Sequence, residues 1–262
     1  MTRTEQIRFL IDRLLAEMPQ YREEAARFPA DAASQRRLLR SLMNLRPPLP
    51  LSGEFLAVQD ALLAAETAEK GVIHVETLPP TREPNLYLWQ GDITRLAADA
   101  IVNAANSALL GCFIPCHGCI DNAIHSAAGL QLRDECARLI RAQGGEEPTG
   151  QAKLTKAFAL PCRYVLHTVG PIVRGAVTEQ NRRELKNCYD ACLHLAATHH
   201  LQSVAFCCIS TGEFHFPNRE AAEIAVAAAR EFLCSHGRDI KVIFNVFKDT
   251  DFKIYQRLLG AD

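Results

Sequence analysis

Three of the ten cysteines and one histidine lie within one stretch of eight residues, as Cys112, Cys116, His117 and Cys119. Thiolate sulfur and imidazole nitrogen are the ligands that zinc prefers, and iron is the lesser alternative. Three protein ligands with an open fourth position are typical of catalytic zinc, whereas four protein ligands make a closed structural site. The stretch therefore predicts a metal site, and its spacing leaves open whether Cys116 is a fourth ligand.

Cys116 and Cys119 also form a Cys-x-x-Cys pair. In a thioredoxin-like protein such a pair opens a helix directly after a strand. Here it lies in the middle of a predicted loop, so metal binding is favoured over redox chemistry. The other cysteines fall on predicted helices or strands and are expected to pack as small apolar side chains: Cys136, Cys162, Cys188, Cys192, Cys207, Cys208 and Cys234.

The overall composition restricts where the protein works and what it binds. Lys+Arg 29 against Asp+Glu 30 gives a net charge of −1, so no global positive field attracts nucleic acid or anionic lipid. No apolar run approaches the roughly 18 to 20 residues of a membrane span, and charges interrupt residues 1–16, where a signal peptide would be apolar. We therefore expect a cytoplasmic protein with reduced thiols and with neither a nucleic-acid nor a membrane partner.

The chain divides into two parts by its predicted elements. Apolar periodicity and proline breaks predict helices over 4–18, 32–45 and 53–70, so residues 1–70 form an amino-terminal helical extension. Strands and helices alternate over residues 71–262, which indicates an α/β sandwich with a largely parallel central sheet. The expected strands are 71–75, 85–89, 99–102, 157–160, 164–169, 203–209 and 241–247, and the expected helices are 121–141, 179–199, 218–235 and 252–259.

Ligands of an open α/β sheet bind beyond the carboxyl ends of its strands. After the strand at 85–89, Gly91 permits a tight turn, and Asp92 can accept hydrogen bonds from an amine such as that of adenine, although an aspartate there is also a common helix cap. Asn103 and Asn106 can present amides to sugar hydroxyls. The turn at 209–218 can direct backbone N–H groups at a phosphate. Taken alone, however, two such asparagines are more often turn residues, and a single strand-to-helix turn containing glycine indicates little.

The ordered motifs resemble the macrodomain family of ADP-ribose-binding α/β/α modules, over roughly residue 86 to the carboxyl terminus. The matching segments are Gln90-Gly-Asp-Ile-Thr94, Val102-Asn-Ala-Ala-Asn106-Ser107, Asp121 with Ala123-Ile-His125 and Ala127-Ala-Gly129, His167-Thr-Val-Gly-Pro171, and Ile209-Ser-Thr-Gly212. The resemblance implies a three-layer fold with a mixed, largely parallel sheet. It also implies that Asp92 recognises adenine, with Ile93 packed beside it, that Asn106 contacts the distal ribose, and that residues 210–214 hold the diphosphate.

The full set of ADP-ribose-binding residues implied by the resemblance is Gly91, Asp92, Ile93, Asn106, Ile120, Asp121, Ser210, Thr211, Gly212, Glu213 and Phe214. Where ordinary hydrolytic macrodomains have a run of glycines, this chain has the cysteine-containing stretch 111–120. That stretch resembles the zinc-dependent macrodomain subclass, which also carries a helical amino-terminal extension. The subclass implies Cys112, His117 and Cys119 as ligands of one zinc ion and Cys116 as a non-ligand.

The resemblance implies a zinc-dependent hydrolase that removes mono-ADP-ribose from acidic side chains of a target protein. Asn103 and Asn106 would fix the ribose and its loop, Asp121 would position or deprotonate water, and zinc would polarise a ribose hydroxyl or a water. His125, four residues after Asp121, is expected to be a core histidine with its hydrogen bonds satisfied. The family further hints at a lipoyl-carrier protein as target, modified by a sirtuin-class ADP-ribosyltransferase.

Two other functions fit the same motifs. The first is a reader module that binds ADP-ribose without turnover, although binding alone requires neither Asp121 nor an open metal site. The second is a phosphoesterase that acts on phosphate derivatives of ADP-ribose, as the resemblance to some macrodomains implies. Release of ADP-ribose from a modified protein separates the hydrolase from the reader, and the mass of the product separates it from the phosphoesterase.

Overall fold

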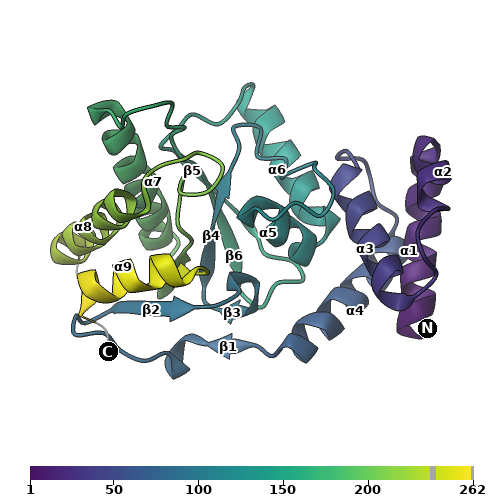
Figure 1. The fold of residues 1–262 in the computed structure, drawn as a ribbon, viewed down its shortest axis with the longest axis horizontal. Coiled ribbons are helices and arrows are strands. Elements are labelled where there is room, and N and C mark those ends of the chain that lie inside the picture. Colours follow the sequence, from purple (N-terminus) through teal and green to yellow (C-terminus); the bar gives the residue numbers. More distant parts are fainter. Residues whose placement is uncertain (237–239, 261–262) are drawn as a thin grey trace.

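The computed structural model describes residues 1–236 and 240–260. Its centre is a six-stranded mixed sheet in the order β2-β8-β7-β4-β6-β5 (Figure 1). The strands are β2 (Leu86–Gln90), β4 (Ala100–Ala105), β5 (Ala152–Lys156), β6 (Tyr164–Val169), β7 (Ser203–Phe206) and β8 (Lys241–Val246). Only β5, at one edge, runs antiparallel to its neighbour within this sheet. The expected largely parallel α/β sheet is confirmed.

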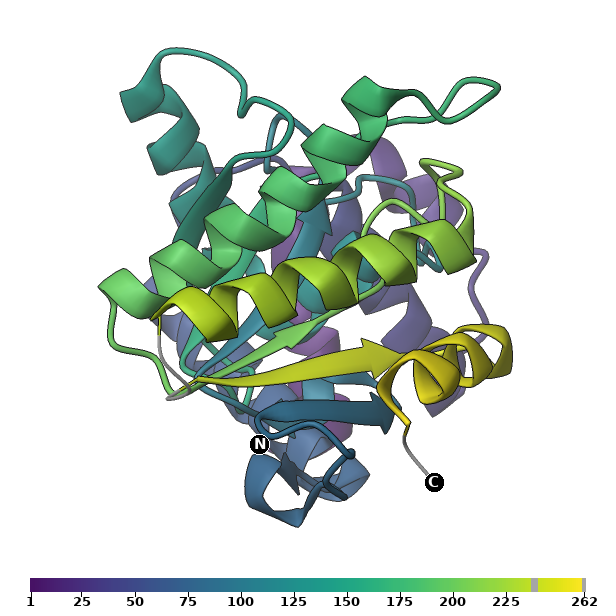
Figure 2. The same ribbon diagram turned by 90° about the vertical axis from the view of Figure 1, so that its left-hand side faces the viewer.

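Helices cover both faces of the sheet. On one face lie α5 (Ile120–Ala128) and α6 (Leu130–Gln143), which contact β4 and β5 respectively. On the other face lie α7 (Glu179–Thr198), α8 (Asn218–His236) and α9 (Asp249–Leu259), and in Figure 2 α7 and α8 cross in front of the sheet. The three expected layers are therefore present. Among the helices described, none combines the length and apolar character needed to cross a membrane.

The first quarter of the chain forms helices that dock beyond α5 and α6, at the right of Figure 1. They are α1 (Arg3–Glu17), the 3₁₀ turn η1 (Pro19–Tyr21), α2 (Arg22–Ala25), α3 (Ala32–Leu45) and α4 (Gly53–Lys70). The side chains of Thr2, Asp31 and Ser52 accept hydrogen bonds from the first turns of α1, α3 and α4. Because these caps are local signals, the predicted bounds of α3 and α4 are confirmed.

Two clusters of buried apolar side chains hold the molecule together. The larger one fills both sides of the central sheet. The smaller one lies between α1, α3 and α4 and includes Leu130, the first residue of α6. Leu130 therefore joins the packing of the extension to that of the α/β layers. Between α4 and β2 lie β1 (Ile73–His74) and η2 (Val75–Thr77). After β2 come η3 (Ile93–Arg95) and β3 (Leu96–Ala97), and β1 and β3 pair in parallel.

Two predicted elements were wrong. The single helix expected over 121–141 is broken at Gly129, whose φ is +93° and where a Cβ would lie 2.6 Å from Nε2 of Gln59 on α4. The strand expected over 157–160 is a turn containing Phe158 at φ +55°. The strand is instead β5, just before it, whose edge position leaves it partly exposed and with a polar sequence.

Candidate functional site

The predicted binding residues gather at one edge of the sheet. Each neighbouring pair from β2 through β8, β7 and β4 to β6 is parallel. The carboxyl ends of these strands therefore lie at the same edge of the sheet. Asp92 follows β2, Asn106 follows β4, Gly170 follows β6, and Ser210 lies four residues after β7. η3, which begins one residue after Asp92, also contacts α5, which carries Asp121. The fold therefore brings together motifs that are up to 118 residues apart in sequence.

Asp121 is the buried carboxylate of this edge, in the first turn of α5 and only 6% exposed. Asn103 Nδ2 donates to its Oδ1 at 2.8 Å, and Asn106 Nδ2 donates to its Oδ2 at 3.2 Å. Burial raises the pKa of Asp121 to about 6, against the opposing effects of the Asn103 hydrogen bond, the Arg133 charge and the Asn106 hydrogen bond. Two amides thus orient one carboxylate, as expected for a group that positions a water.

A buried network lies behind the carboxylate. Asn103 Nδ2 is 3.2 Å from His167 Nδ1, and because an amide nitrogen only donates, that ring nitrogen is the acceptor. His167 Nε2 then carries the proton and faces Thr155 Oγ1 at 3.0 Å and Cys136 Sγ at 3.7 Å. Burial lowers the pKa of His167 to about 3, which keeps the ring neutral. His167 therefore fixes which end of the Asn103 amide faces Asp121.

His125 differs from its expected role. It is buried, at 5% exposed, but neither ring nitrogen has a hydrogen-bond partner within the described chain. Its Nε2 lies 3.5 Å from Oδ1 of Asp121, and burial lowers its pKa well below the usual range. The ring of His125 also occupies the space beside Gly111, where a Cβ would lie 2.8 Å from it. His125 is thus a core histidine, but not a satisfied one.

The cysteine loop, residues 111–119, brings three metal-ligand atoms together. Sγ of Cys112, a ring nitrogen of His117 and Sγ of Cys119 all lie within 4.8 Å of one another, and Cys112 Sγ is 3.7 Å from His117 Nδ1. Sulfur and nitrogen on a tetrahedral zinc lie about 3.6 Å apart, given Zn–S of about 2.3 Å and Zn–N of about 2.1 Å. The donor types and their spacing therefore fit zinc. Burial raises the pKa of Cys119 to about 12, and the charges of Cys112 and Asp121 add to that effect.

Cys116 lies outside this group of donors. Its Sγ faces α3, at 3.4 Å from Ser41 Oγ and 3.6 Å from the Arg37 carbonyl oxygen. Its backbone N–H donates to Asn44 Oδ1 at 2.9 Å, and its φ is +51°. The geometry therefore favours three ligands over the four-ligand alternative, because the Cys116 thiol faces the extension rather than the other donors.

Side chains from other segments tie the cysteine loop down. Asn122, fully buried on α5, donates to the carbonyl oxygens of Ile114 at 2.9 Å and Cys112 at 3.4 Å. Its Oδ1 accepts from Nη2 of Arg40 at 2.7 Å, and the same Nη2 lies 3.4 Å from the His117 carbonyl oxygen. The loop is therefore shaped largely by hydrogen bonds to α3 and α5.

The buried Arg133 of α6 joins α3 to the cysteine loop. Its Nη1 donates to the carbonyl oxygens of Met43 and Asn44, both at 3.0 Å, and also to that of Arg46. Its Nε donates to the Leu110 carbonyl oxygen at 2.7 Å, and its guanidinium stacks over the ring of Phe113 at 4.3 Å. Burial lowers the pKa of Arg133 to about 10, so the group stays charged at neutral pH.

The serine loop, residues 209–217, is shaped mainly by its own backbone, and from outside it Val173 N donates to the Phe214 carbonyl oxygen at 2.9 Å. Phe216 N donates to the Ser210 carbonyl oxygen at 2.9 Å, and His215 N donates to that of Gly212 at 3.1 Å. Ser210 has φ +63°, and its buried Oγ has no partner in the part of the chain that is described. No described group accepts from the N–H groups of residues 212–214. These free donors at the end of a strand suit an anionic ligand.

The segment after β2 is held by a turn. Asp92 Oδ1 accepts from Thr94 N at 3.0 Å and from Thr94 Oγ1 at 2.6 Å, so Asp92 does cap η3, while nothing in residues 1–236 or 240–260 bonds its Oδ2. Ile93 is buried beside it. A Cβ at Gly91 would lie 2.5 Å from the Trp89 ring, so this position requires glycine. Asp92 therefore serves as a cap and still offers one carboxylate oxygen to a ligand.

The cysteine and serine loops meet. His117 Nε2 lies 3.8 Å from Oε1 of Glu213, which is itself exposed. Ile120, half-buried, begins α5 between the loop and Asp121. The carboxylate, the three metal-ligand atoms and the free backbone donors thus lie around one region. The exposed and half-buried residues among them leave that region open to a ligand.

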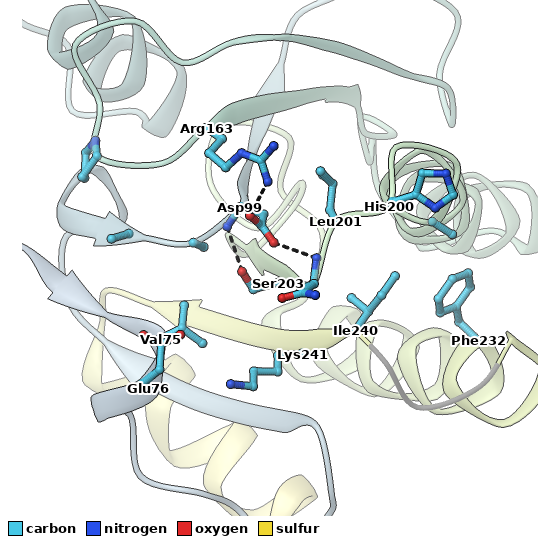
Figure 3. A pocket seen from close by; sticks show the side chains of 15 residues that line it. Val75, Glu76, Asp99, Arg163, His200, Leu201, Ser203, Phe232, Ile240 and Lys241 are labelled. Atoms are coloured by element: carbon cyan, nitrogen blue, oxygen red, sulfur yellow. Dashed lines mark hydrogen bonds and ion pairs between the residues drawn. The ribbon is translucent and has the colours of Figure 1, made fainter.

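A cavity of about 830 Å³ lies at the opposite edge of the sheet. Figure 3 shows Asp99 at its centre, where its carboxylate accepts from Arg163 at 3.0 Å and from Gln202 N at 2.7 Å. Ser203 and Lys241, which also line it, begin β7 and β8, so the cavity faces the amino ends of the parallel strands. Asp99 N also donates to Ser203 Oγ at 2.8 Å, and none of the lining residues belongs to the predicted site.

Four residues that hold the site from behind are not among those expected from the sequence. They are Arg40, Asn44, Asn122 and Arg133, all engaged with the cysteine loop or with α3. Their partners lie elsewhere in the chain, up to 90 residues away for Arg133. Asn122 was the one detectable case, because it directly follows Asp121 on the same helix.

Comparison with known proteins gives a consistent relationship. Residues 102–225 match the family described as the macro domain. The chain is 49% identical over 263 residues to a protein-ADP-ribose hydrolase of Treponema medium, covering 99% of this chain and 100% of that protein. It is 50% identical over 226 residues to a protein-ADP-ribose hydrolase of Staphylococcus aureus strain Mu50, covering 86% and 85%. The chain therefore belongs to the macrodomain family.

Solved structures agree with this assignment. The Trypanosoma brucei macrodomain in complex with ADP-ribose has a TM-score of 0.66 and 32% identity, over 84% of this chain and 95% of that one. The Oceanobacillus iheyensis macrodomain with ADP has a TM-score of 0.63 and 36% identity, over 70% of this chain and 94% of that one. The expected fold is confirmed.

Proposed function

We propose that this chain is a zinc-dependent hydrolase that releases ADP-ribose from mono-ADP-ribosylated acidic side chains of a protein. One observation carries the proposal: a buried carboxylate, Asp121, is oriented by Asn103 and Asn106 and lies two residues from a cluster of three zinc-type ligands. Binding alone would require neither group. The relatives named protein-ADP-ribose hydrolases support the activity.

The ligand would lie across the carboxyl edge of the sheet. Asp92 would accept from the adenine amine through its free oxygen, and Ile93 would pack beside the base. The unpaired N–H groups of residues 212–214 would bind the diphosphate, which explains how a chain of net charge −1 holds a dianion. The distal ribose would then reach Asn106 and Asp121, next to the cysteine loop.

Hydrolysis adds water across the bond between the ribose anomeric carbon and the acceptor carboxylate. The water oxygen bonds to the carbon, and the acceptor side chain leaves as a carboxylate. Whether that carboxylate is then protonated depends on the pH of the solution. Asp121 would orient the water and accept its proton, while Asn106 would hold both Asp121 and the Gly111 carbonyl oxygen in place. Zinc bound to Cys112, His117 and Cys119 would polarise a ribose hydroxyl or a water.

The test is turnover of a protein carrying aspartyl-ADP-ribose, with the product identified by mass. A lipoyl-carrier protein modified by a sirtuin-class transferase is the first substrate to assay, as the resemblance implies. Free ADP-ribose is expected, with turnover reduced about 10²- to 10⁴-fold in Asp121→Asn. Tight ADP-ribose binding without release would make the chain a reader, and release of phosphate would make it a phosphoesterase.

A further inference from the structure

We propose that helix α3 of the amino-terminal extension holds the cysteine loop in its metal-binding shape, with Asn44 and Arg40 as positioning residues. This inference rests on the proposed zinc site and assigns a role to the extension. Asn44 is 1% exposed, and its Oδ1 accepts the Cys116 N–H at 2.9 Å while its Nδ2 donates to Ser126 Oγ of α5 at 3.0 Å. The amide thus bridges the loop and α5.

The contacts from α3 reach the cysteine loop next to its metal ligand His117. Cys116 directly precedes the ligand His117, and its φ of +51° is a conformation that a non-glycine residue rarely adopts without support. Arg40 reaches the next carbonyl oxygen, that of His117, and the Oδ1 of Asn122. The two α3 side chains therefore bind the loop on both sides of the Cys116–His117 peptide, and so set the direction from which His117 meets the two thiols.

The test measures the zinc affinity of the loop and, in the metal-free protein, the hydrogen exchange of its backbone. In Asn44→Ala, zinc affinity measured by competition with a chelating indicator should weaken about tenfold, the lower end of what lost outer-shell partners cost. The visible spectrum of the cobalt-substituted protein should shift, because the ligand geometry changes. Hydrogen exchange at the Cys116 amide should accelerate about tenfold in the metal-free protein. Gln35→Ala is the matched control, because Gln35 lies on α3 and its side chain bonds, among the described residues, only the Pro29 carbonyl oxygen.

Unchanged zinc affinity and unchanged Cys116 exchange in Asn44→Ala would overturn the inference. Arg40→Met provides a second variant if Asn44→Ala does not fold. If the wild type binds no zinc, the metal part of the proposed function fails, and the exchange measurement still decides whether α3 orders the loop. A loss of thermal stability shared by Gln35→Ala and Asn44→Ala, with no change specific to Asn44→Ala, would show a general packing role instead.

A second, independent observation concerns the outer face of the same helix. A groove of about 720 Å³ lies between α1, α3, α4 and Cys116. Its lining contains five basic side chains and two carboxylates, in a chain whose net charge is −1: Arg3, Arg36, Arg37, Arg40, Lys70, Glu66 and Glu69. Glu69 pairs with Arg3, and Glu66 pairs with Arg36. The described chain supplies no carboxylate partner for Arg37 or Lys70.

We infer that this groove binds an acidic segment of the ADP-ribosylated protein, next to the modified side chain. The inference rests on the proposed function. Under that function the modified side chain leaves the ligand at the distal ribose, beside the cysteine loop, and Cys116 belongs to both the loop and the groove lining. The polypeptide that carries the modification therefore passes along the groove. Its excess of basic groups favours carboxylates over basic or neutral segments.

The probe is a pair of ADP-ribosylated peptides that differ only in glutamates or glutamines flanking the modified residue. For wild type, the KM of the glutamate peptide should be about fivefold lower than that of the glutamine peptide, and the ratio should shrink with salt. Arg37→Glu should abolish the difference between the two KM values. Arg138→Glu, an exposed change of equal charge on α6, should preserve it.

Equal KM values for the two peptides, with normal turnover, would overturn the groove assignment. If neither peptide is turned over, the proposed function fails. The groove is then tested by itself, through fluorescence anisotropy of the labelled, unmodified glutamate peptide at low salt. Binding to wild type that Arg37→Glu weakens would support the groove, and equal binding would overturn it.

Discussion

The cysteine loop and the serine loop lie at the same edge of the sheet but are built in opposite ways. The cysteine loop, residues 111–119, takes its shape from side chains of α3, α5 and α6, chiefly Asn44, Asn122 and Arg133. The serine loop, residues 209–217, is closed mainly by its own backbone hydrogen bonds and positive φ angles, with one outside bond from Val173 N. A loop that must present three side chains at fixed angles needs outside support, whereas a loop that presents backbone N–H groups can be locally complete.

The largest effect is expected when a metal ligand is removed, because this change should affect the cysteine loop and not the serine loop. In Cys112→Ser, zinc content should fall to background and turnover of aspartyl-ADP-ribose should drop about 10²- to 10³-fold, because a preorganised charge at the reacting group is lost. ADP-ribose affinity should stay within about twofold, because the serine loop depends on none of these contacts. Metal analysis, kinetics and calorimetry on the same preparations check this.

Cys234→Ser is the matched control, because Cys234 is an exposed cysteine on α8, outside the site. It should keep wild-type zinc content and turnover. Full zinc content and turnover in Cys112→Ser would refute the metal site. A parallel loss of ADP-ribose affinity would show that the two loops are not independent.

The same contrast explains what could be predicted from the sequence. Helices α3 and α4 were predicted with correct bounds, because caps and apolar periodicity are local. The grouping of Asp92, Asn106 and Ser210 followed from one rule about the carboxyl ends of parallel strands. Strand β5 was missed because it is a polar edge strand, and the break at Gly129 was missed because it depends on the approach of Gln59 from α4.

The support of the cysteine loop could not be predicted for a related reason. Asn44 is 72 residues from Cys116, and Arg133 is 89 residues from Asn44. Before folding, nothing distinguishes these residues from other polar side chains on amphipathic helices. The ligand types were visible because their chemistry is unusual. The supporting residues act only through geometry that tertiary packing creates.

An intermediate effect is expected from a change aimed at the serine loop. A Cβ at Gly170 would lie 2.8 Å from Ile209 Cγ2 and would overlap Ser210 Oγ, so Gly170→Ala must displace the loop. Because the displaced N–H groups no longer point at the diphosphate, ADP-ribose should bind about tenfold more weakly, by calorimetry, and the overpacking should lower the free energy of unfolding by about 1–3 kcal/mol. Zinc content should be unchanged, which is the converse of the Cys112→Ser result.

Gly145→Ala is the control for this change, because a Cβ at Gly145 meets nothing within 4 Å and its φ is not positive. It should bind ADP-ribose as the wild type does. If Gly170→Ala binds ADP-ribose normally, the serine loop is not the anion site. If it also loses zinc, the contact between His117 and Glu213 couples the loops more strongly than their hydrogen bonds indicate.

The smallest effect is expected at Cys116, the residue on which the three-ligand and the four-ligand interpretations of the metal site differ. Because its Sγ faces Ser41 and the Arg37 carbonyl oxygen, a serine hydroxyl can replace the thiol without touching the donors. Cys116→Ser should retain full zinc content, turnover within about twofold and a free energy of unfolding within about 0.5 kcal/mol of wild type. Cys119→Ser, three residues further on, should lose zinc. Loss of zinc in both variants would make Cys116 a fourth ligand and the site a closed one, and the open position required for catalysis would disappear.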